Sequence, residues 1–148
     1  MERNFYFRQT SVFLLRIEVP HYDISFRGNV NISITGGTIA NVFGGGSHST
    51  SGGTTTAGDV TITVSGGDIT GDIYARGQLD GDTTGAASVI FTGATDFSCG
   101  VFGYSYVGGA VGGATLTFNG YTGTFSGKVG GFSSVAFNDG AADRKSVV

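Results

Sequence analysis

Tryptophan is absent from this 148-residue chain, and proline, cysteine and charged side chains are scarce. The single cysteine, Cys99, excludes an intramolecular disulfide framework. One proline, without glycine at every third position, excludes a collagen triple helix. Charged residues make up 13% of the chain and hydrophobic residues 39%, a balance that excludes a disordered linker. No apolar run approaches the roughly 18 residues of a membrane-spanning helix, so we expect no transmembrane segment in this sequence.

Basic side chains are almost missing between residues 28 and 142, where Arg76 and Lys128 stand against seven aspartates. Proteins that bind nucleic acid use lysine and arginine to neutralise phosphates. Anionic membrane surfaces attract the same side chains. We therefore expect neither nucleic acid nor an anionic membrane surface among the partners.

The two ends of the chain differ in character from its middle. Residues 1–27 contain four arginines and no glycine, whereas all 28 glycines lie further along. We interpret residues 1–27 as an N-terminal cap or as an upstream segment, and the sequence leaves both alternatives open. Residues 143–148 match the in-frame translation of a common sequencing adapter, so we interpret them as an artefact in a metagenomic fragment. On that interpretation, the natural protein continues past Ala142 into further repeats.

A degenerate repeat fills residues 28–142. Its clearest copies begin at Gly28 and Gly58, where alternating apolar residues are followed by a Gly-Gly pair and then by a second apolar pair. Alternation with a period of two is typical of a strand with one buried face. Glycine supplies the positive φ that a tight corner requires. The first strands are expected at residues 30–34, 60–64, 87–91 and 114–118, with a partial fifth copy at 135–138.

Spacing between the copies separates a constant core from inserted loops. Ile62, Val89 and Leu116 follow one another at intervals of 27 residues, but only 19 residues separate Leu116 from Val135. The longer repeats therefore carry an extra loop, and each loop falls at the same point of its repeat. The loops are expected at residues 44–57, 76–85 and 103–113.

Fixed-period repeats with insertions at one corner are typical of solenoids. The sequence predicts an all-β parallel β-solenoid (a β-helix) of four to five rungs, with a β-sandwich of hairpins as the alternative. In the solenoid, equivalent apolar residues stack in interior ladders, with phenylalanine replacing isoleucine in the later rungs. The predicted ladders are Ile32/Ile62/Val89/Leu116, Ile34/Val64/Phe91/Phe118 and, on the opposing wall, Ile39/Ile69/Phe97/Phe125.

Residues 28–140 resemble the glycine-rich repeats of bacterial parallel β-helix adhesins and autotransporter-type passenger domains. The resemblance is carried by the alternating strand, the Gly-Gly pair, the second apolar pair and the run Gly44–Gly46. Ala75 and Arg76 replace glycines of this pattern, and Ala94 and Tyr121 occupy the second Gly position of later copies. The resemblance implies structural scaffolding within a large secreted or surface-anchored bacterial protein.

Candidate catalytic and metal-binding groups are few. His48 has neighbouring serines but no acid to orient it as a base, and His21 has no evident partner. Asp80 and Asp82 carry the oxygen atoms that calcium prefers, together with Asp59, Asp68 and Asp72, but they lack the EF-hand pattern. The repeat body has no glutamate to build the paired acids of a glycosidase. We therefore predict no catalytic residue, no metal site and no cofactor, and we interpret Cys99 as a small residue at a corner.

Tyr104 and Tyr106 lie in the third inserted loop and are the candidate carbohydrate contacts, since an aromatic ring offers an apolar face and a polar tip. We expect a structural and adhesive repeat region of a bacterial surface or secreted protein. It is expected to lie outside the cell or on its surface, to contact host or surface glycans or proteins, and to have no catalytic activity of its own. The alternatives are a polysaccharide-active β-helix enzyme (lyase or glycosidase) and a fibre or tail-spike component.

Overall fold

The computed structural model describes residues 29–45, 58–77, 85–104 and 113–138, and these residues form nine strands and no helix. Each described range contributes one strand to a large sheet and one to a small sheet, and the last range adds a ninth strand. We number the ranges as repeats 1 to 4 and regard the ninth strand as the start of repeat 5. The strands are β1 (Val30–Ile39), β2 (Val42–Phe43), β3 (Val60–Ile69), β4 (Ile73–Tyr74), β5 (Ala87–Phe91), β6 (Val101–Phe102), β7 (Ala114–Asn119), β8 (Val129–Gly130) and β9 (Ser134–Asn138).

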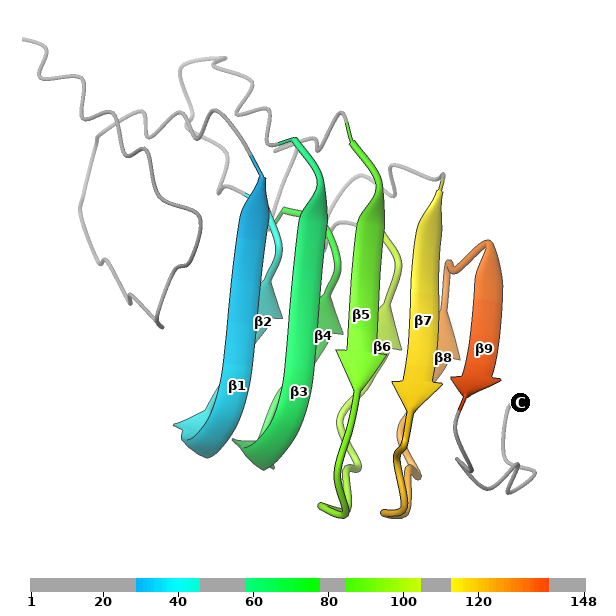
Figure 1. The fold of residues 1–148 in the computed structure, drawn as a ribbon. Coiled ribbons are helices and arrows are strands. Elements are labelled where there is room, and N and C mark those ends of the chain that lie inside the picture. The colour runs from blue at the N-terminus through cyan, green and yellow to red at the C-terminus, as the bar shows by residue number, and fades with distance from the viewer. Residues whose placement is uncertain (1–28, 46–57, 78–84, 105–112, 139–148) are drawn as a thin grey trace, which may run out of the picture.

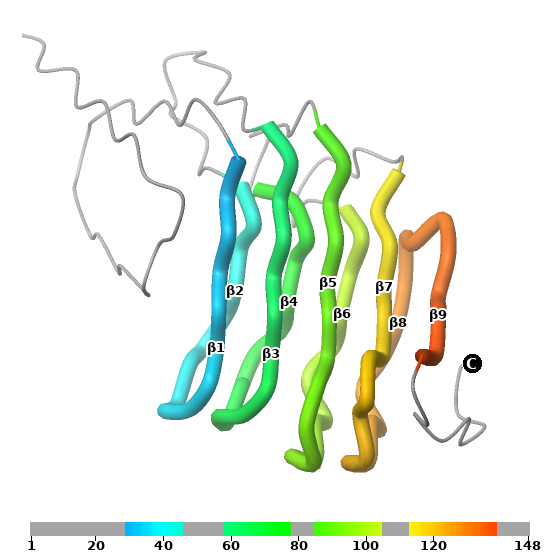
Figure 2. Tube along the Cα trace, viewed as in Figure 1, coloured from blue at the N-terminus to red at the C-terminus, as the bar shows by residue number. Residues whose placement is uncertain are grey.

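All strand pairings among the described residues are parallel and join one repeat to the next. The large sheet has the order β1-β3-β5-β7-β9 and the small sheet the order β2-β4-β6-β8. In each repeat the chain follows a strand of the large sheet, turns at one edge and returns along the small sheet (Figures 1 and 2). A sandwich of hairpins would instead pair consecutive strands in antiparallel fashion. The all-β fold with two parallel sheets is compatible with the predicted β-solenoid.

The register of the large sheet confirms two of the three predicted ladders in full. Ile32, Ile62, Val89, Leu116 and Val135 are successive Cα partners, and so are Ile34, Val64, Phe91, Phe118 and Phe137. Of the third predicted ladder two steps are confirmed: Ile39 pairs with Ile69 at the ends of β1 and β3, and Phe97 pairs with Phe125. Stacking equivalent residues lets one period-two pattern bury the same face in every repeat.

The division of each repeat into strands differs from the prediction. The Gly36-Gly37 pair was expected to end the first strand, but β1 and β3 both continue through their Gly-Gly pairs to Ile39 and Ile69. Gly37 and Gly67 have φ values of 84° and 99°, so both strands bend at the same point. Because neighbouring repeats bend together, backbone pairing continues past the corner with a local shift in register. The strands of the small sheet are correspondingly short.

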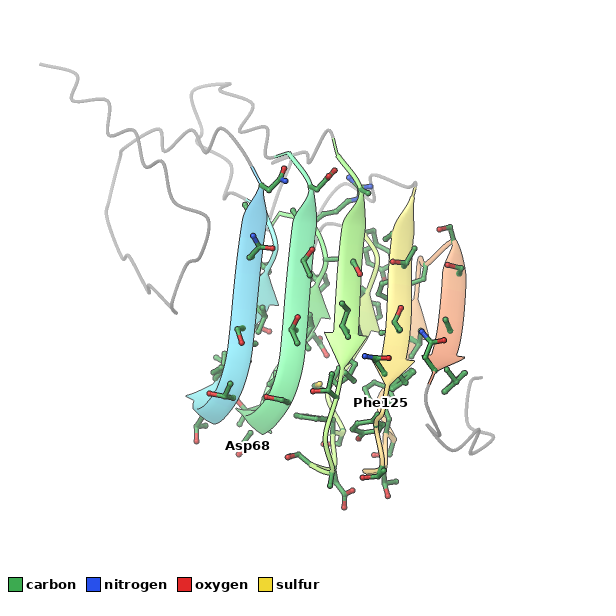
Figure 3. All side chains as sticks on the ribbon, in the orientation of Figure 1. Asp68 and Phe125 are labelled. Carbon is green, nitrogen blue, oxygen red and sulfur yellow. The ribbon has the colours of Figure 1, made fainter. Side chains whose placement is uncertain are left out.

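The core lies between the two sheets and changes from aliphatic to aromatic along the stack. Ile62, Val64 and Ile73 fill repeat 2 and are fully buried. In repeats 3 and 4 the ring of Phe91 contacts four other rings at centroid distances of 5.1 to 6.1 Å. Those rings belong to Phe97, Phe118, Tyr121 and Phe125, the last of which lies near the end of β7 (Figure 3). The predicted replacement of isoleucine by phenylalanine thus produces a different filling of the interior.

The predicted inserted loops lie largely outside the described residues, as do residues 1–27 and 143–148. The described part of the chain is interrupted after β2, after β4 and after β6, at the same point of each repeat. Between β8 and β9 it is continuous, and Ser133 N donates to Ala114 O at 2.8 Å across this short corner. The spacing of 19 residues between Leu116 and Val135 therefore corresponds to a repeat without an insertion.

Candidate functional site

A row of aromatic side chains follows the outer face of the small sheet. Val42, Ile73 and Val101 are buried in the core, so the next residue of each two-residue strand points to the other face. Those outward residues are Phe43, Tyr74 and Phe102, which are Cα partners in the sheet. Phe43 stacks on Tyr74 at 5.5 Å between ring centroids, and Tyr74 stacks on Phe102 at 5.3 Å.

Tyr104, from repeat 3, continues this row over the backbone of repeat 4. The Cα partner of Phe102 in β8 is Gly130, which has no side chain to continue the row. Tyr104 stacks on Phe102 at 5.2 Å and lies over the glycine backbone, so that a Cβ built on Gly131 would collide with its ring. A residue of repeat 3 thus covers the place that repeat 4 leaves open. We define Phe43, Tyr74, Phe102 and Tyr104 as the aromatic row.

Because the rings of the aromatic row stack on one another, a ligand could contact only part of each ring. The rings of Phe43 and Tyr74 are within 10° of parallel, and those of Phe102 and Tyr104 within 30°. Ring faces inside the row are therefore occupied by neighbouring rings, and Tyr74 in the middle of the row is only 6% exposed. Tyr104, predicted as a carbohydrate contact, is half-buried within the row. Its predicted companion Tyr106 lies outside the described residues.

Asparagine and aspartate side chains form a second repeated feature, at the corners. Asn41 Oδ1 accepts from Asp72 N at 3.0 Å, and Asp72 Oδ1 accepts from Gly100 N at 2.8 Å. Asn29 Oδ1 accepts in the same way from Asp59 N at 3.1 Å, and Asp59 Oδ1 accepts from Ala86 N at 2.9 Å. Each side chain satisfies a main-chain N–H of the following repeat, which would otherwise lack an acceptor at the corner.

Asp96 makes the same kind of bond between repeats 3 and 4, where its Oδ1 accepts from Thr124 N. Hydroxyl groups of repeat 2 bond back to the main chain of repeat 1. Ser65 Oγ donates to Ile34 O and Thr70 Oγ1 donates to Ile39 O, each at 3.3 Å. Side chains thus bond each repeat to the one before it and to the one after it. We call the set Asn29, Asn41, Asp59, Asp72 and Asp96 the corner caps.

Replacing Asp72 by alanine is expected to lower the free energy of unfolding by about 2 kcal/mol, because the buried Gly100 N–H loses its acceptor. Asp72→Asn is the matched control and should stay within about 0.5 kcal/mol of the wild type. Asn41 holds the equivalent corner of repeat 1 and makes the same bond, which shows that an amide fits. Urea unfolding followed by circular dichroism measures both variants. Equal losses in the two would show that the charge of Asp72, rather than its acceptor, matters.

The predicted calcium ligands separate in the described structure. Asp59 and Asp72 serve as corner caps, whereas Asp68 is exposed near the end of β3 (Figure 3). Asp80, Asp82, His21 and His48 lie outside the described residues. Among residues 29–45, 58–77, 85–104 and 113–138, no three His, Cys, Asp or Glu side chains gather as metal ligands would. The two basic residues of the repeats also differ: Arg76 is buried and Lys128 is exposed.

Cys99 and Tyr121 are buried ionisable groups of the aromatic end of the core. Burial raises the pKa of the Cys99 thiol from 9.0 to about 11, and the Asp72 carboxylate adds to the shift. Burial likewise raises the pKa of Tyr121 from 10.0 to about 12, with a further contribution from Asp96. The Tyr121 hydroxyl donates to Thr95 O at 2.8 Å, so the neutral phenol has a defined structural role. Cys99 lies at a corner, as predicted, and holds its proton at neutral pH.

Stability is expected to fall between about pH 9 and pH 12. Both groups hold their protons more tightly in the folded state than in the unfolded state. Raising the pH through this window therefore favours the unfolded chain, which ionises first. Tyr121→Phe should remove the part of the loss between about pH 10 and 12, and Cys99→Ser the part between about pH 9 and 11. Urea unfolding at pH 8, 10 and 11 tests this, and an unchanged midpoint would contradict it.

The sequence contained a signal for the corner caps that composition and motif reasoning missed. Asn29 and Asp59 directly precede the first strands of repeats 1 and 2, and Asn41 and Asp72 directly precede the second strands. Recurrence of Asn or Asp at the same two places in repeats 1 and 2 indicates a shared hydrogen-bonding role.

Comparison with models of known protein families, with curated proteins and with solved structures finds no match to this chain. No helix in the described part of the chain has the length and apolar character needed to cross a membrane.

Proposed function

We propose that residues 28–142 form a parallel β-solenoid that acts as a structural and adhesive repeat region of a bacterial surface or secreted protein. The observation that supports this most directly is the in-register stacking of equivalent strands through five repeats. Corner caps, hydroxyl groups and the aromatic row add side-chain contacts between the same repeats. These contacts between neighbouring repeats make the stack resistant to deformation.

The proposed mechanism is mechanical. Backbone hydrogen bonds between parallel strands point along the stacking direction, so stretching the stack must break several of them together. Interleaved apolar ladders resist bending because a closely packed interior has little free volume. The strands β2, β4 and β6 are neighbours in the small sheet, so the insertions that follow them in the sequence start from adjacent places in the stack.

We propose that the repeats have no catalytic activity of their own. Asp59, Asp72 and Asp96 each accept a main-chain N–H bond within the stack. Their carboxylates thus support the fold, which leaves them less suited to act as a general acid and base.

Binding of the immobilised chain to a panel of glycans and extracellular-matrix proteins tests the adhesive part. We expect Tyr106→Ala, in the third inserted loop, to weaken binding at least fivefold. Thr63→Ala is the matched control on the large sheet, where Thr63 lies on the face opposite to the buried Ile62 and Val64, and it should bind as the wild type does. Absence of binding to the whole panel would contradict adhesion and leave a purely structural role. Equal binding by both variants would show that this tyrosine is not a contact.

A further inference from the structure

One Asn-Gly pair occurs in the sequence, at Asn119 and Gly120 where β7 ends. The equivalent place in repeats 1 to 3, one position after the residue that stacks in the same ladder as Phe118, holds a hydroxyl residue. These residues are Thr35, Ser65 and Thr92. A main-chain nitrogen can attack the carboxamide of an asparagine, whereas a hydroxyl side chain has no such group. Repeat 4 therefore carries a reactive group where the earlier repeats carry an inert one.

The corner at Asn119 is open to solvent and sterically unhindered. The Asn119 side chain is exposed, so water reaches its carboxamide. Gly120 has a φ of 59°, and a Cβ built on it would meet no atom within 4 Å. Glycine has no side chain that could shield its own nitrogen from the carboxamide of the preceding residue. The nitrogen of Gly120 is therefore well placed to react with the Asn119 side chain once it is free to turn.

A main-chain hydrogen bond restrains this nitrogen. Gly120 N donates to Asn138 O at 3.0 Å, and Asn119 is the Cα partner of Asn138 in the pairing of β7 with β9. Attack on the carboxamide requires that Gly120 N loses its proton and turns toward the Asn119 side chain. Both changes break the bond to Asn138 O, so the reaction can proceed only when this corner opens. A further strand on the other edge of β9 would leave this bond in place.

We propose that Asn119 is a site of spontaneous deamidation, which the pairing of β7 with β9 holds in check. When the corner opens, Gly120 N attacks Asn119 Cγ, and Nδ2 leaves as ammonia with the proton from Gly120 N. A five-membered succinimide then joins the two residues. Water adds either at Cγ, which gives aspartate, or at the main-chain carbonyl carbon of Asn119, which gives isoaspartate. The amide and water are thus converted to a carboxylate and ammonium, and neither an oxidant nor a reductant is needed.

The isoaspartate product changes the junction between repeats 4 and 5 permanently. It places an additional carbon atom in the main chain before Gly120, which moves Gly120 N away from Asn138 O. Tyr121 follows directly, is 5% exposed, and donates from its hydroxyl to Thr95 O at 2.8 Å. A shift of the main chain at Gly120 therefore also disturbs the aromatic part of the core. The inference does not depend on the adhesive function proposed above.

Peptide mapping by mass spectrometry during incubation of the full chain at about pH 8 tests the proposal. We expect the gain in mass that marks conversion of the Asn119 amide to an acid, at least tenfold faster in urea than in the folded chain. Asn119→Thr is the matched control, because threonine holds this place in repeats 1 and 3, and this peptide should then show no gain. After ageing, the folded wild type should unfold at a lower urea concentration than Asn119→Asp, which has the same charge but a normal main chain.

Two destabilised variants test whether this corner opens locally. Phe137→Ala removes a β9 ring that stacks on Phe118 at 5.0 Å, and it should raise the rate in the folded chain at least threefold. Asp72→Ala is the control, because it weakens the stack between repeats 2 and 3 and should leave that rate unchanged. Equal rates in the folded and unfolded chain, no gain in mass in urea, the same folded-chain rate in both variants, or an aged chain as stable as Asn119→Asp would each overturn the proposal.

Discussion

Replacing Phe91 by alanine is expected to lower the free energy of unfolding by about 3–5 kcal/mol, the loss typical of a fully buried phenylalanine. Its ring contacts Phe97, Phe118 and Phe125, so the cavity would open at the centre of the aromatic part of the core. These neighbours come from different segments held by backbone pairing and have little freedom to close the gap. The total stability of a domain is about 5–15 kcal/mol, so this one change would remove a large share of it.

Phe137→Ala is the matched control because Phe137 is the last described residue of the same ladder and is 39% exposed. We expect it to cost about 1 kcal/mol, since a side chain that is partly in water loses less on truncation. Urea unfolding followed by circular dichroism measures both variants. Similar losses for the two residues would contradict the position of Phe91 at the centre of the core.

Replacing Gly127 by alanine is expected to cost about 3 kcal/mol, through steric conflict rather than lost contacts. A Cβ at this position would collide with the carbonyl oxygen of Cys99 in the preceding repeat. The backbones are held close here because Val101 N donates to Lys128 O at 2.7 Å. Relief of the conflict would require the two corners to separate and this hydrogen bond to lengthen.

Gly36→Ala is the control for a glycine in the same kind of repeat. A Cβ at Gly36 meets no atom within 4 Å, and its φ lies outside the left-handed region. The variant should be as stable as the wild type or slightly more stable, because alanine restricts the unfolded chain. Thermal unfolding compares the two variants directly. A tolerated Gly127→Ala would show that the corners of repeats 3 and 4 lie further apart than described.

The large sheet was predictable because its pattern is long enough to define a register. Ile32 and Ile34 have equivalents in every later repeat, so aligning the copies also aligns the strands. The small sheet was less predictable, since Val42–Phe43 and Ile73–Tyr74 are too short to show an alternation. Continuation of β1 beyond Gly37 depends on the matching bend in β3, which is a property of two repeats and not of one.

The candidate site also depends on contacts between repeats that the sequence of one repeat alone does not show. Tyr104 was predicted as a carbohydrate contact from its place in a loop sequence, but its packing depends on Gly130 in the next repeat. The row of Phe43, Tyr74 and Phe102 required knowledge of which residues become Cα partners. The corner caps also act between repeats, and aspartate composition alone pointed toward calcium instead.

The corner caps have a consequence for how such a chain changes through evolution. Repeat 2 takes up the acceptor Asn41 Oδ1 from repeat 1 and supplies the acceptor Asp72 Oδ1 to repeat 3. Duplication or deletion of one complete unit therefore recreates the same junction between the units that become neighbours. Unequal recombination within such a gene would lengthen or shorten the protein while preserving its fold. A shift of one residue within a corner would instead misplace a cap and the backbone group that it serves.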